Sequence, residues 1–170
     1  FAVYPLAVQA VGGVGIEVPA QNFAHDLEAM AAAIAANTKV VFIANPNNPT
    51  GTWFSRRVFE SFMAQVPESV LVVLDEAYVE YATDSHFMNG FDYVDKYPNL
   101  LVSRTFSKAY GLASLRVGYA IASPDVTNIL NRVRQPFNVN SFALAAAAAS
   151  LQDDEFVAQS RALNSTGMAQ

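Results

Sequence analysis

Four short apolar runs are spaced along the chain between turn-forming residues, at residues 40–44, 70–74, 100–102 and 117–122. They are rich in β-branched residues and leucine, and they are nearly continuous rather than alternating with polar positions. Continuous runs of this length are typical of strands that are buried on both faces of a sheet. The pattern therefore predicts an α/β protein whose sheet is covered by helices on both sides.

Segments whose apolar residues recur at helical spacing lie between or beside these runs. Ser55 can cap a helix whose apolar positions recur at helical spacing through residues 58–66, and Pro67 follows its end. Residues 40–74 are thus predicted to form a βαβ unit. Three further helices are predicted, at residues 26–36, 125–134 and 141–151.

The connection between the last two runs indicates the direction of the final strand. About fourteen residues separate Val102 from Val117, which is short for a helical crossover between parallel strands. We therefore expect an antiparallel last strand and a three-layer α/β/α sandwich with a mostly parallel, mixed sheet. Residues 12–15, Gly-Gly-Val-Gly, lack the third glycine of a dinucleotide fingerprint and are predicted as a turn between strands.

The composition argues against several classes of function. Only 15% of the 170 residues are charged, and 15 acidic against 10 basic side chains leave no basic stripe for nucleic acid. The longest apolar stretch, residues 142–149, is about half of what a bilayer span needs. Without cysteine there is no thiolate site, and His25 and His86 stand too far apart to predict a metal site. We expect a cytoplasmic protein that binds neither nucleic acid nor membranes.

The two ends of the chain suggest a piece of a longer protein. Phe1 opens directly on an apolar run, and residues 160–170 stop without a terminating signal. The low charged fraction also predicts a surface that normally lies against something else. We expect residues 1–170 to form a single fragment of one domain.

The first candidate for chemistry is the string Asn-Pro-Asn-Asn-Pro-Thr-Gly at residues 45–51, directly after the first apolar run. In open α/β sheets ligands bind outside the carboxyl ends of the strands, and a rigid loop there can point an amide side chain at a ligand. A plain loop with Asx turns is the alternative.

The second candidate is the pair Asp75 and Glu76, which follows the second run. Asp75 at this edge can face a cationic or protonated atom of a ligand. The alternative is that Asp75 caps the following segment and Glu76 pairs with an arginine.

The third candidate is the string Ser-Arg-Thr-Phe-Ser-Lys-Ala-Tyr-Gly-Leu at residues 103–112, with Arg116 eight residues beyond Lys108. Hydroxyl groups and a guanidinium suit an anionic group such as a phosphate. A lysine in such a cationic place is expected to have a depressed pKa, and a neutral amine can attack a carbonyl to form a Schiff base. A serine-rich turn with solvated bases is the alternative.

In chain order, these three strings and Gln-Pro-Phe-Asn-Val-Asn at residues 135–140 resemble the large domain of the fold type I, class II pyridoxal-phosphate-dependent aminotransferases. The likeness is greatest to the histidinol-phosphate aminotransferase family and extends from Phe1 to about Leu151. It implies that the family's N-terminal segment, glycine-rich phosphate turn and C-terminal small domain lie outside residues 1–170.

The resemblance also implies a role for single residues. Lys108 would form the Schiff base with pyridoxal 5'-phosphate and move the substrate's proton, and Asp75 would pair with the ring nitrogen of the cofactor. Asn48 and Tyr78 would hydrogen-bond the 3-hydroxyl oxygen. The cofactor phosphate would be bound by Thr105, Ser107 and Arg116. The two faces of the ring would be covered by Ala77 and Phe1.

The implied reaction is the transamination of histidinol phosphate with 2-oxoglutarate, in histidine biosynthesis, by a homodimer. Because the partner subunit of family members adds a tyrosine to the phosphate site, we expect residues 1–170 alone to bind the cofactor weakly and not to turn over. An aromatic aminotransferase, a phospho-amino-acid decarboxylase, a non-catalytic effector-binding domain and an inert structural piece remain as alternatives.

Overall fold

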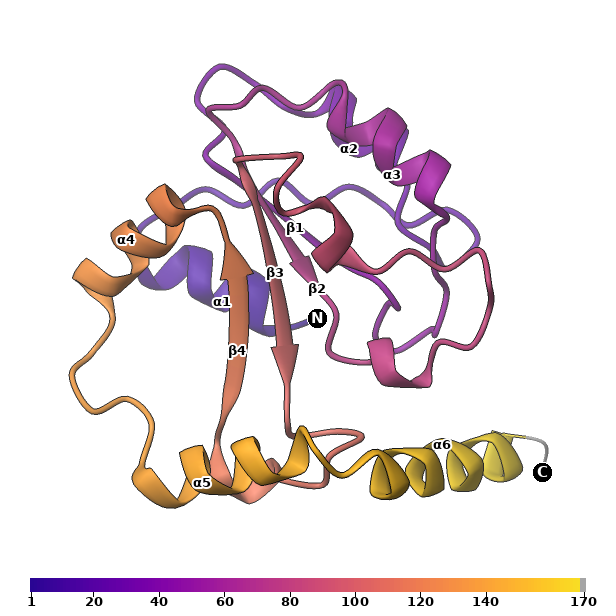
Figure 1. Cartoon of the computed structure of the whole chain (residues 1–170). Helices are drawn as coiled ribbons and strands as arrows, with labels where there is room; N and C mark the ends of the chain where they lie inside the picture. Colours follow the sequence, from indigo (N-terminus) through magenta and orange to yellow (C-terminus); the bar gives the residue numbers. More distant parts are fainter. Residues whose placement is uncertain (169–170) are drawn as a thin grey trace.

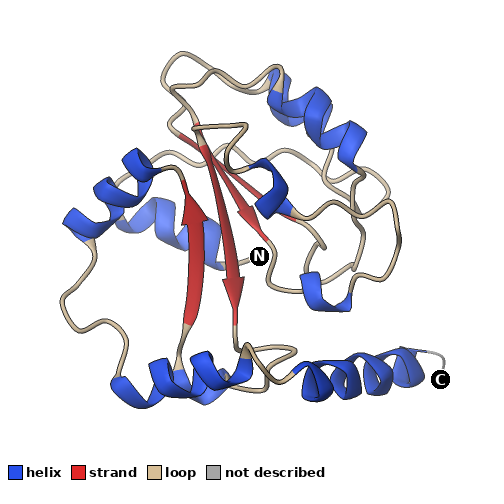
Figure 2. Ribbon diagram, viewed as in Figure 1, coloured by secondary structure: helices blue, strands red, loops and turns tan. Residues whose placement is uncertain are grey.

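A mixed four-stranded sheet forms the centre of the chain in the computed structural model, which describes residues 1–168 (Figures 1 and 2). The strands follow one another in the order β1, β2, β3 and β4, the first three parallel and the last antiparallel to β3. Their bounds are Val40–Ala44, Leu71–Asp75, Leu100–Thr105 and Gly118–Ala122. The predicted mixed sheet with an antiparallel last strand is confirmed, although β3 runs three residues further than expected.

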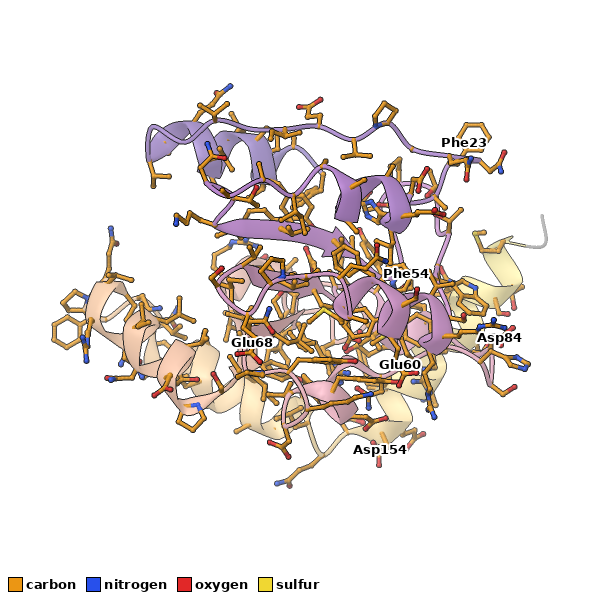
Figure 3. All side chains as sticks on the ribbon, turned by 90° about the horizontal axis from the view of Figure 1, so that it is seen from above. Phe23, Phe54, Glu60, Glu68, Asp84 and Asp154 are labelled. Atoms are coloured by element: carbon orange, nitrogen blue, oxygen red, sulfur yellow. The ribbon has the colours of Figure 1, made fainter. Side chains whose placement is uncertain are left out.

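One face of the sheet carries the main core. Alternate residues of the strands point to this face, and Ile43, Val72 and Val102 are fully buried there. Helices α2 (Leu27–Ala32) and α3 (Arg56–Met63) cover it together with the short 3-10 helix η2 (Gly90–Tyr93). Figure 3 shows Phe54 among the packed side chains, whereas Phe23 projects from the periphery. Removal of this apolar surface from water is the main stabilising contribution to the fold.

The opposite face is covered by α1 (Val3–Ala10), which lies behind the sheet in Figure 1. Tyr4 stacks on Phe42 of β1, with 5.0 Å between the ring centroids and 11° between the planes. No residue of α1 is fully buried, so this layer is thinner than the other. Helix α4 (Pro124–Val133) packs against β4, and the helices on both faces confirm the expected α/β class.

Two further helices, α5 (Ser141–Ser150) and α6 (Asp154–Met168), run one after the other beyond the carboxyl end of β3 (Figure 1). Ala143 and Ala147 of α5 form a second apolar cluster with Phe106 and Val117. The Ser160 hydroxyl of α6 donates a hydrogen bond to the Ala109 carbonyl at 3.0 Å. These helices therefore pack on the segment that contains Lys108. The bounds of two remaining 3-10 helices, η1 and η3, are Val79–Tyr81 and Ala113–Leu115.

Two local predictions are wrong. The helix expected at residues 26–36 ends at Ala32, because Ile34 turns back to the Ala31 carbonyl and the Ala35 amide donates to the Thr38 hydroxyl oxygen. This turn brings the chain into β1.

The glycines at residues 12–15 do not join two strands either. Gly12, with a φ of +72°, ends α1, where its amide donates to Gln9 and that of Gly13 donates to Val8. This pair of hydrogen bonds is the Schellman helix end, which requires a left-handed residue and so favours glycine.

Candidate functional site

The three strings meet at one edge of the sheet. Ala44 pairs with Asp75 and Asp75 with Ser103, so the carboxyl ends of β1, β2 and β3 are in register. A cavity of about 50 Å³ lies at this edge. Its lining residues come from four separate segments of the chain: Phe1, Tyr4, Ala44, Pro46, Asn48, Asp75, Ala77, Tyr78 and Lys108.

The loop after β1 is anchored by a buried amide. Asn45 is fully buried; its side-chain oxygen accepts from the Phe54 amide at 3.0 Å, and its side-chain nitrogen donates to the Phe54 carbonyl. This pairing closes the loop on itself, and the Asn48 side chain of the same loop lines the cavity. Asn48 donates to the Tyr78 hydroxyl at 3.4 Å. The loop therefore presents a paired amide and phenol.

The carboxylate of Asp75 is held at both oxygens. Oδ1 accepts from the Ala77 amide at 3.1 Å, and Oδ2 accepts from the Tyr4 hydroxyl at 2.7 Å. Asp75 thus caps the turn that follows β2, as one alternative predicted, and also lines the cavity. Burial, with the adjacent Asp75 charge, raises the pKa of Tyr4 far above its ordinary value. Tyr4 accordingly remains a hydrogen-bond donor.

Glu76 points away from Asp75, to the other face of the sheet. It is fully buried and accepts two hydrogen bonds from Arg104, at 2.9 and 2.6 Å, and one from the Gly90 amide at 2.6 Å. Arg104 in turn lies 3.6 Å from the centre of the Phe91 ring. Burial raises the pKa of Glu76, and the Arg104 guanidinium opposes that shift. The prediction that Glu76 pairs with an arginine is confirmed.

Lys108 lies in the loop after β3, with its Nζ 5.1 Å from the centre of the Tyr78 ring. Its side chain is exposed, while its neighbours Ala109 and Phe106 are buried. The apolar anchors fix the loop, and the amine reaches the cavity wall. The arrangement therefore places a primary amine, a carboxylate and an amide–phenol pair around one space.

The residues expected to hold a phosphate lie between the end of β3 and the start of β4, outside the cavity lining. The Thr105 hydroxyl oxygen accepts from the Ser107 amide at 3.1 Å. Arg116 adopts a left-handed backbone, with a φ of +53°, and its guanidinium donates to the Ala113 carbonyl at 2.8 Å. The structure thus brings together at one cavity Phe1, Asn48, Asp75, Ala77, Tyr78 and Lys108. Thr105, Ser107 and Arg116 lie near Lys108 in the sequence but do not line that cavity.

Two features were missed by the sequence analysis. Tyr4 was not predicted to contact Asp75; its only signal in the sequence is its helical spacing from Phe1. A larger, open cavity of about 670 Å³ between η1 and α6 was also not predicted. Arg161 of α6 donates there to the Glu80 carbonyl, and one oxygen of the buried Glu80 carboxylate has no hydrogen-bond partner among residues 1–168.

Neither histidine belongs to a metal-binding cluster in the described part of the chain. Within residues 1–168, no group of three or more histidine, aspartate or glutamate side chains could hold a metal ion. His25 instead accepts a hydrogen bond from the Ala44 amide through Nε2 at 3.2 Å, and His86 pairs with Asp84. Over the same residues, no helix is both long and apolar enough to cross a membrane.

Comparison with known proteins identifies the class to which this fold and site correspond. Residues 1–170 match the family model described as aminotransferase class I and II, and the chain belongs to that family.

More particular similarities point to one group of enzymes within it. The chain is 66% identical over 170 residues to histidinol-phosphate aminotransferase 2 of Pseudomonas fluorescens strain Pf0-1, and 66% identical to the protein of that name from Pseudomonas aeruginosa. In both cases all of this chain aligns with 46% of the relative, so it spans about half the length of these curated relatives. The crystal structure of histidinol-phosphate aminotransferase from Sinorhizobium meliloti, in complex with pyridoxal-5'-phosphate, matches with a TM-score of 0.89 and 34% identity. That match covers 95% of this chain and 44% of the other.

Proposed function

We propose that the protein containing this chain is a pyridoxal-phosphate-dependent aminotransferase. The observation that carries the proposal is the convergence of Lys108, Asp75 and the Asn48–Tyr78 pair on one cavity at the carboxyl edge of the sheet. These groups fit the cofactor chemically, because it offers an aldehyde to an amine, a ring nitrogen to a carboxylate and a phenolic oxygen to hydrogen-bond donors. Membership of the family and the likeness to a cofactor-bound relative support the same assignment.

The chemistry of the cofactor defines what the side chains must do. When bound, pyridoxal phosphate accepts the electron pair left behind as a substrate's Cα loses its proton. The Asp75 carboxylate keeps the ring nitrogen protonated, which favours this electron flow. Lys108 would hold the cofactor covalently through Nζ, and the same amine would accept and return the proton of the substrate's Cα.

The remaining residues bind and orient. Asn48 and Tyr78 hold the phenolic oxygen, and Ala77 and Phe1 cover the two faces of the ring. Thr105, Ser107 and Arg116 bind the phosphate, since hydroxyl groups and a guanidinium donate hydrogen bonds to its oxygens and the guanidinium offsets part of its negative charge. One N–H of the exposed Arg116 guanidinium donates to the Ala113 carbonyl, and a guanidinium has five such donors, so others can reach the phosphate.

We further propose histidinol phosphate as the amino donor and 2-oxoglutarate as the acceptor, giving imidazole acetol phosphate and glutamate. The names of the relatives at 66% identity support this choice over an aromatic aminotransferase or a phospho-amino-acid decarboxylase. The full-length protein is proposed to act as a cytoplasmic homodimer. Residues 1–170 alone are proposed to bind the cofactor weakly and to lack steady turnover, because they correspond to under half of each relative.

The test is a substrate panel with the purified full-length protein. We expect glutamate-coupled turnover with histidinol phosphate to exceed turnover with aromatic amino acids, and no carbon dioxide from phosphothreonine. Lys108→Ala should lower the rate about 10⁴-fold or more, because it removes both the covalent link and the proton carrier. The matched control Lys96→Ala should keep the rate, since Lys96 pairs with Glu60 at the surface and neither residue lines the cavity. Retention of most of the rate in Lys108→Ala would refute the proposal.

A further inference from the structure

Asp75 has a hydrogen-bond partner, Tyr4, to which the proposed reaction assigns no role. Tyr4 donates its hydroxyl to Oδ2 of Asp75 at 2.7 Å, across 71 positions of sequence. Both groups are partly buried. A hydrogen bond of this length to a charged oxygen is at the strong end of the protein range.

Two aromatic rings fix the position of Tyr4 at the cavity wall. Its ring stacks on Phe42 at 5.0 Å between centroids, and Phe1 meets it edge-on at 5.6 Å. Phe42 pairs with Val73, two residues before Asp75. The tyrosine ring therefore lies over the strands, while Ala77 and Lys108 come from loops beyond the strand ends.

This placement leaves acceptor capacity on Asp75 for a ligand. An ionised carboxylate has about four lone-pair positions. Within residues 1–168, two of them are occupied, by the Tyr4 hydroxyl and the Ala77 amide. Burial raises the pKa of Tyr4, so the phenol keeps its proton and can only donate to the carboxylate at neutral pH. Tyr4 and a protonated ring nitrogen can thus bind Asp75 together.

We propose that Tyr4 is a positioning residue that holds the Asp75 carboxylate in the orientation in which it receives the cofactor's ring nitrogen. The proposal rests on the proposed function, since it assumes that Asp75 meets this nitrogen. In this proposal Tyr4 acts through its hydrogen bond to Asp75. When the Tyr4 hydroxyl is removed, Asp75 loses one of the two hydrogen bonds that its side chain makes within residues 1–168 and can rotate about its side-chain torsions.

The experiment compares Tyr4→Phe with wild type in the full-length protein loaded with pyridoxal phosphate. Phenylalanine keeps the ring and its stack on Phe42, and only the hydroxyl is lost. The matched control is Tyr97→Phe, because Tyr97 is partly buried, stacks on Tyr93 with 6.1 Å between the ring centroids, and does not line the cavity. The two readouts are the dissociation constant of the cofactor and the pH midpoint of the change in its visible absorption.

We expect Tyr4→Phe to bind the cofactor about tenfold more weakly, which corresponds to the loss of one hydrogen bond to a charged group. We also expect the pH midpoint to rise. A less well oriented Asp75 stabilises the proton on the cofactor's ring nitrogen less, so the ring carries less positive charge. With less positive charge nearby, the nitrogen that joins Lys108 to the cofactor is protonated more easily, and the pH midpoint rises. Tyr97→Phe should change neither value.

Any other result contradicts either the role of Tyr4 or the proposed function. Unchanged affinity and midpoint in Tyr4→Phe would overturn the role of Tyr4. Weaker binding with an unmoved midpoint would also overturn it, because a purely structural contribution of α1 gives that result. If wild type shows no visible absorption linked to Lys108, the proposed function itself fails, which this design separates from a failure at Tyr4 alone.

Discussion

Asp75 and Glu76 are adjacent in sequence yet serve opposite faces of the sheet. Successive side chains of a strand alternate in direction, so Asp75 faces Tyr4 and the cavity while Glu76 enters the core side and binds Arg104. Glu76 fixes Arg104 and Gly90 around itself. Asp75 is therefore available to a ligand, whereas Glu76 links the end of β2 to β3 and η2.

The buried pair gives a prediction about stability. Glu76→Gln leaves the Arg104 guanidinium without its charged partner in a site where the pair is shielded from water, with 13% of the Arg104 side chain exposed. We expect the free energy of unfolding to fall by about 3 kcal/mol, measured by urea denaturation. The control Glu68→Gln, at an exposed position, should change it by less than about 0.5 kcal/mol. Equal effects of the two substitutions would contradict the structural role of Glu76.

The convergence of residues 45–51, Asp75 and Lys108 could be predicted because each follows an apolar run. The carboxyl ends of parallel strands meet at one edge, so local pattern and topology suffice. The contact of Tyr4 with Asp75 could not be predicted in this way. It depends on where α1 crosses the sheet, and no local pattern encodes a contact across 71 positions.

Among the elements, those with a local signal were predicted well. Helix α3 begins after Ser55 and carries Phe59 and Phe62 into the core, as its spacing indicated. The helix predicted at residues 26–36 was too long, because alanine propensity favours helix everywhere in that stretch while the tertiary path into β1 requires a turn after Ala32. Helix propensity thus predicted that this segment is helical but not the residue at which the helix ends.

Because η2 packs closely on the sheet, we expect glycine-to-alanine substitutions at two positions to change the free energy of unfolding in opposite directions. A Cβ on Gly90 would lie 2.7 Å from both Glu76 Oε1 and Leu74 Cδ2, so Gly90→Ala must displace buried groups. We expect a loss of about 1–3 kcal/mol in the free energy of unfolding. Gly167→Ala in α6 meets nothing within 4 Å and should stabilise the helix by up to about 1 kcal/mol. Thermal or urea unfolding distinguishes the two, and a neutral Gly90→Ala would contradict this packing.

At the scale of the whole molecule, the cavity is assembled from the N-terminal helix, the loop after β1, the end of β2 and the loop after β3. Helices α5 and α6 then pack on the last of these loops. Since no single segment contains the site, its geometry depends on the global fold. His25 illustrates the dependence, because it bonds to the amide of Ala44 in the cavity wall from a loop 19 residues earlier.

This histidine predicts a pH dependence of stability. Burial lowers the pKa of His25 below its ordinary value of 6.5 in the folded state. Between the folded and the ordinary value, the unfolded chain binds more protons, so the free energy of unfolding falls as the pH decreases through and below about 6.5. Protonation also removes the acceptor for the Ala44 amide.

We expect His25→Gln to flatten this part of the profile of unfolding free energy against pH between about 7 and 5. Glutamine still offers an acceptor but does not titrate. His86→Gln is the control, because His86 lies exposed beside Asp84 and should leave the His25 contribution in place. A profile that His25→Gln does not alter would contradict the assigned burial of His25.

The most direct test of the account is to locate the amine that binds pyridoxal phosphate. The full-length protein is incubated with the cofactor and reduced with borohydride, and the modified peptide is identified by mass spectrometry. Within these 170 residues the lysines are Lys39, Lys96 and Lys108. We predict a stoichiometric adduct on Lys108 alone. An adduct spread over the three lysines, or none on Lys108, would contradict the assignment of this cavity as the cofactor site.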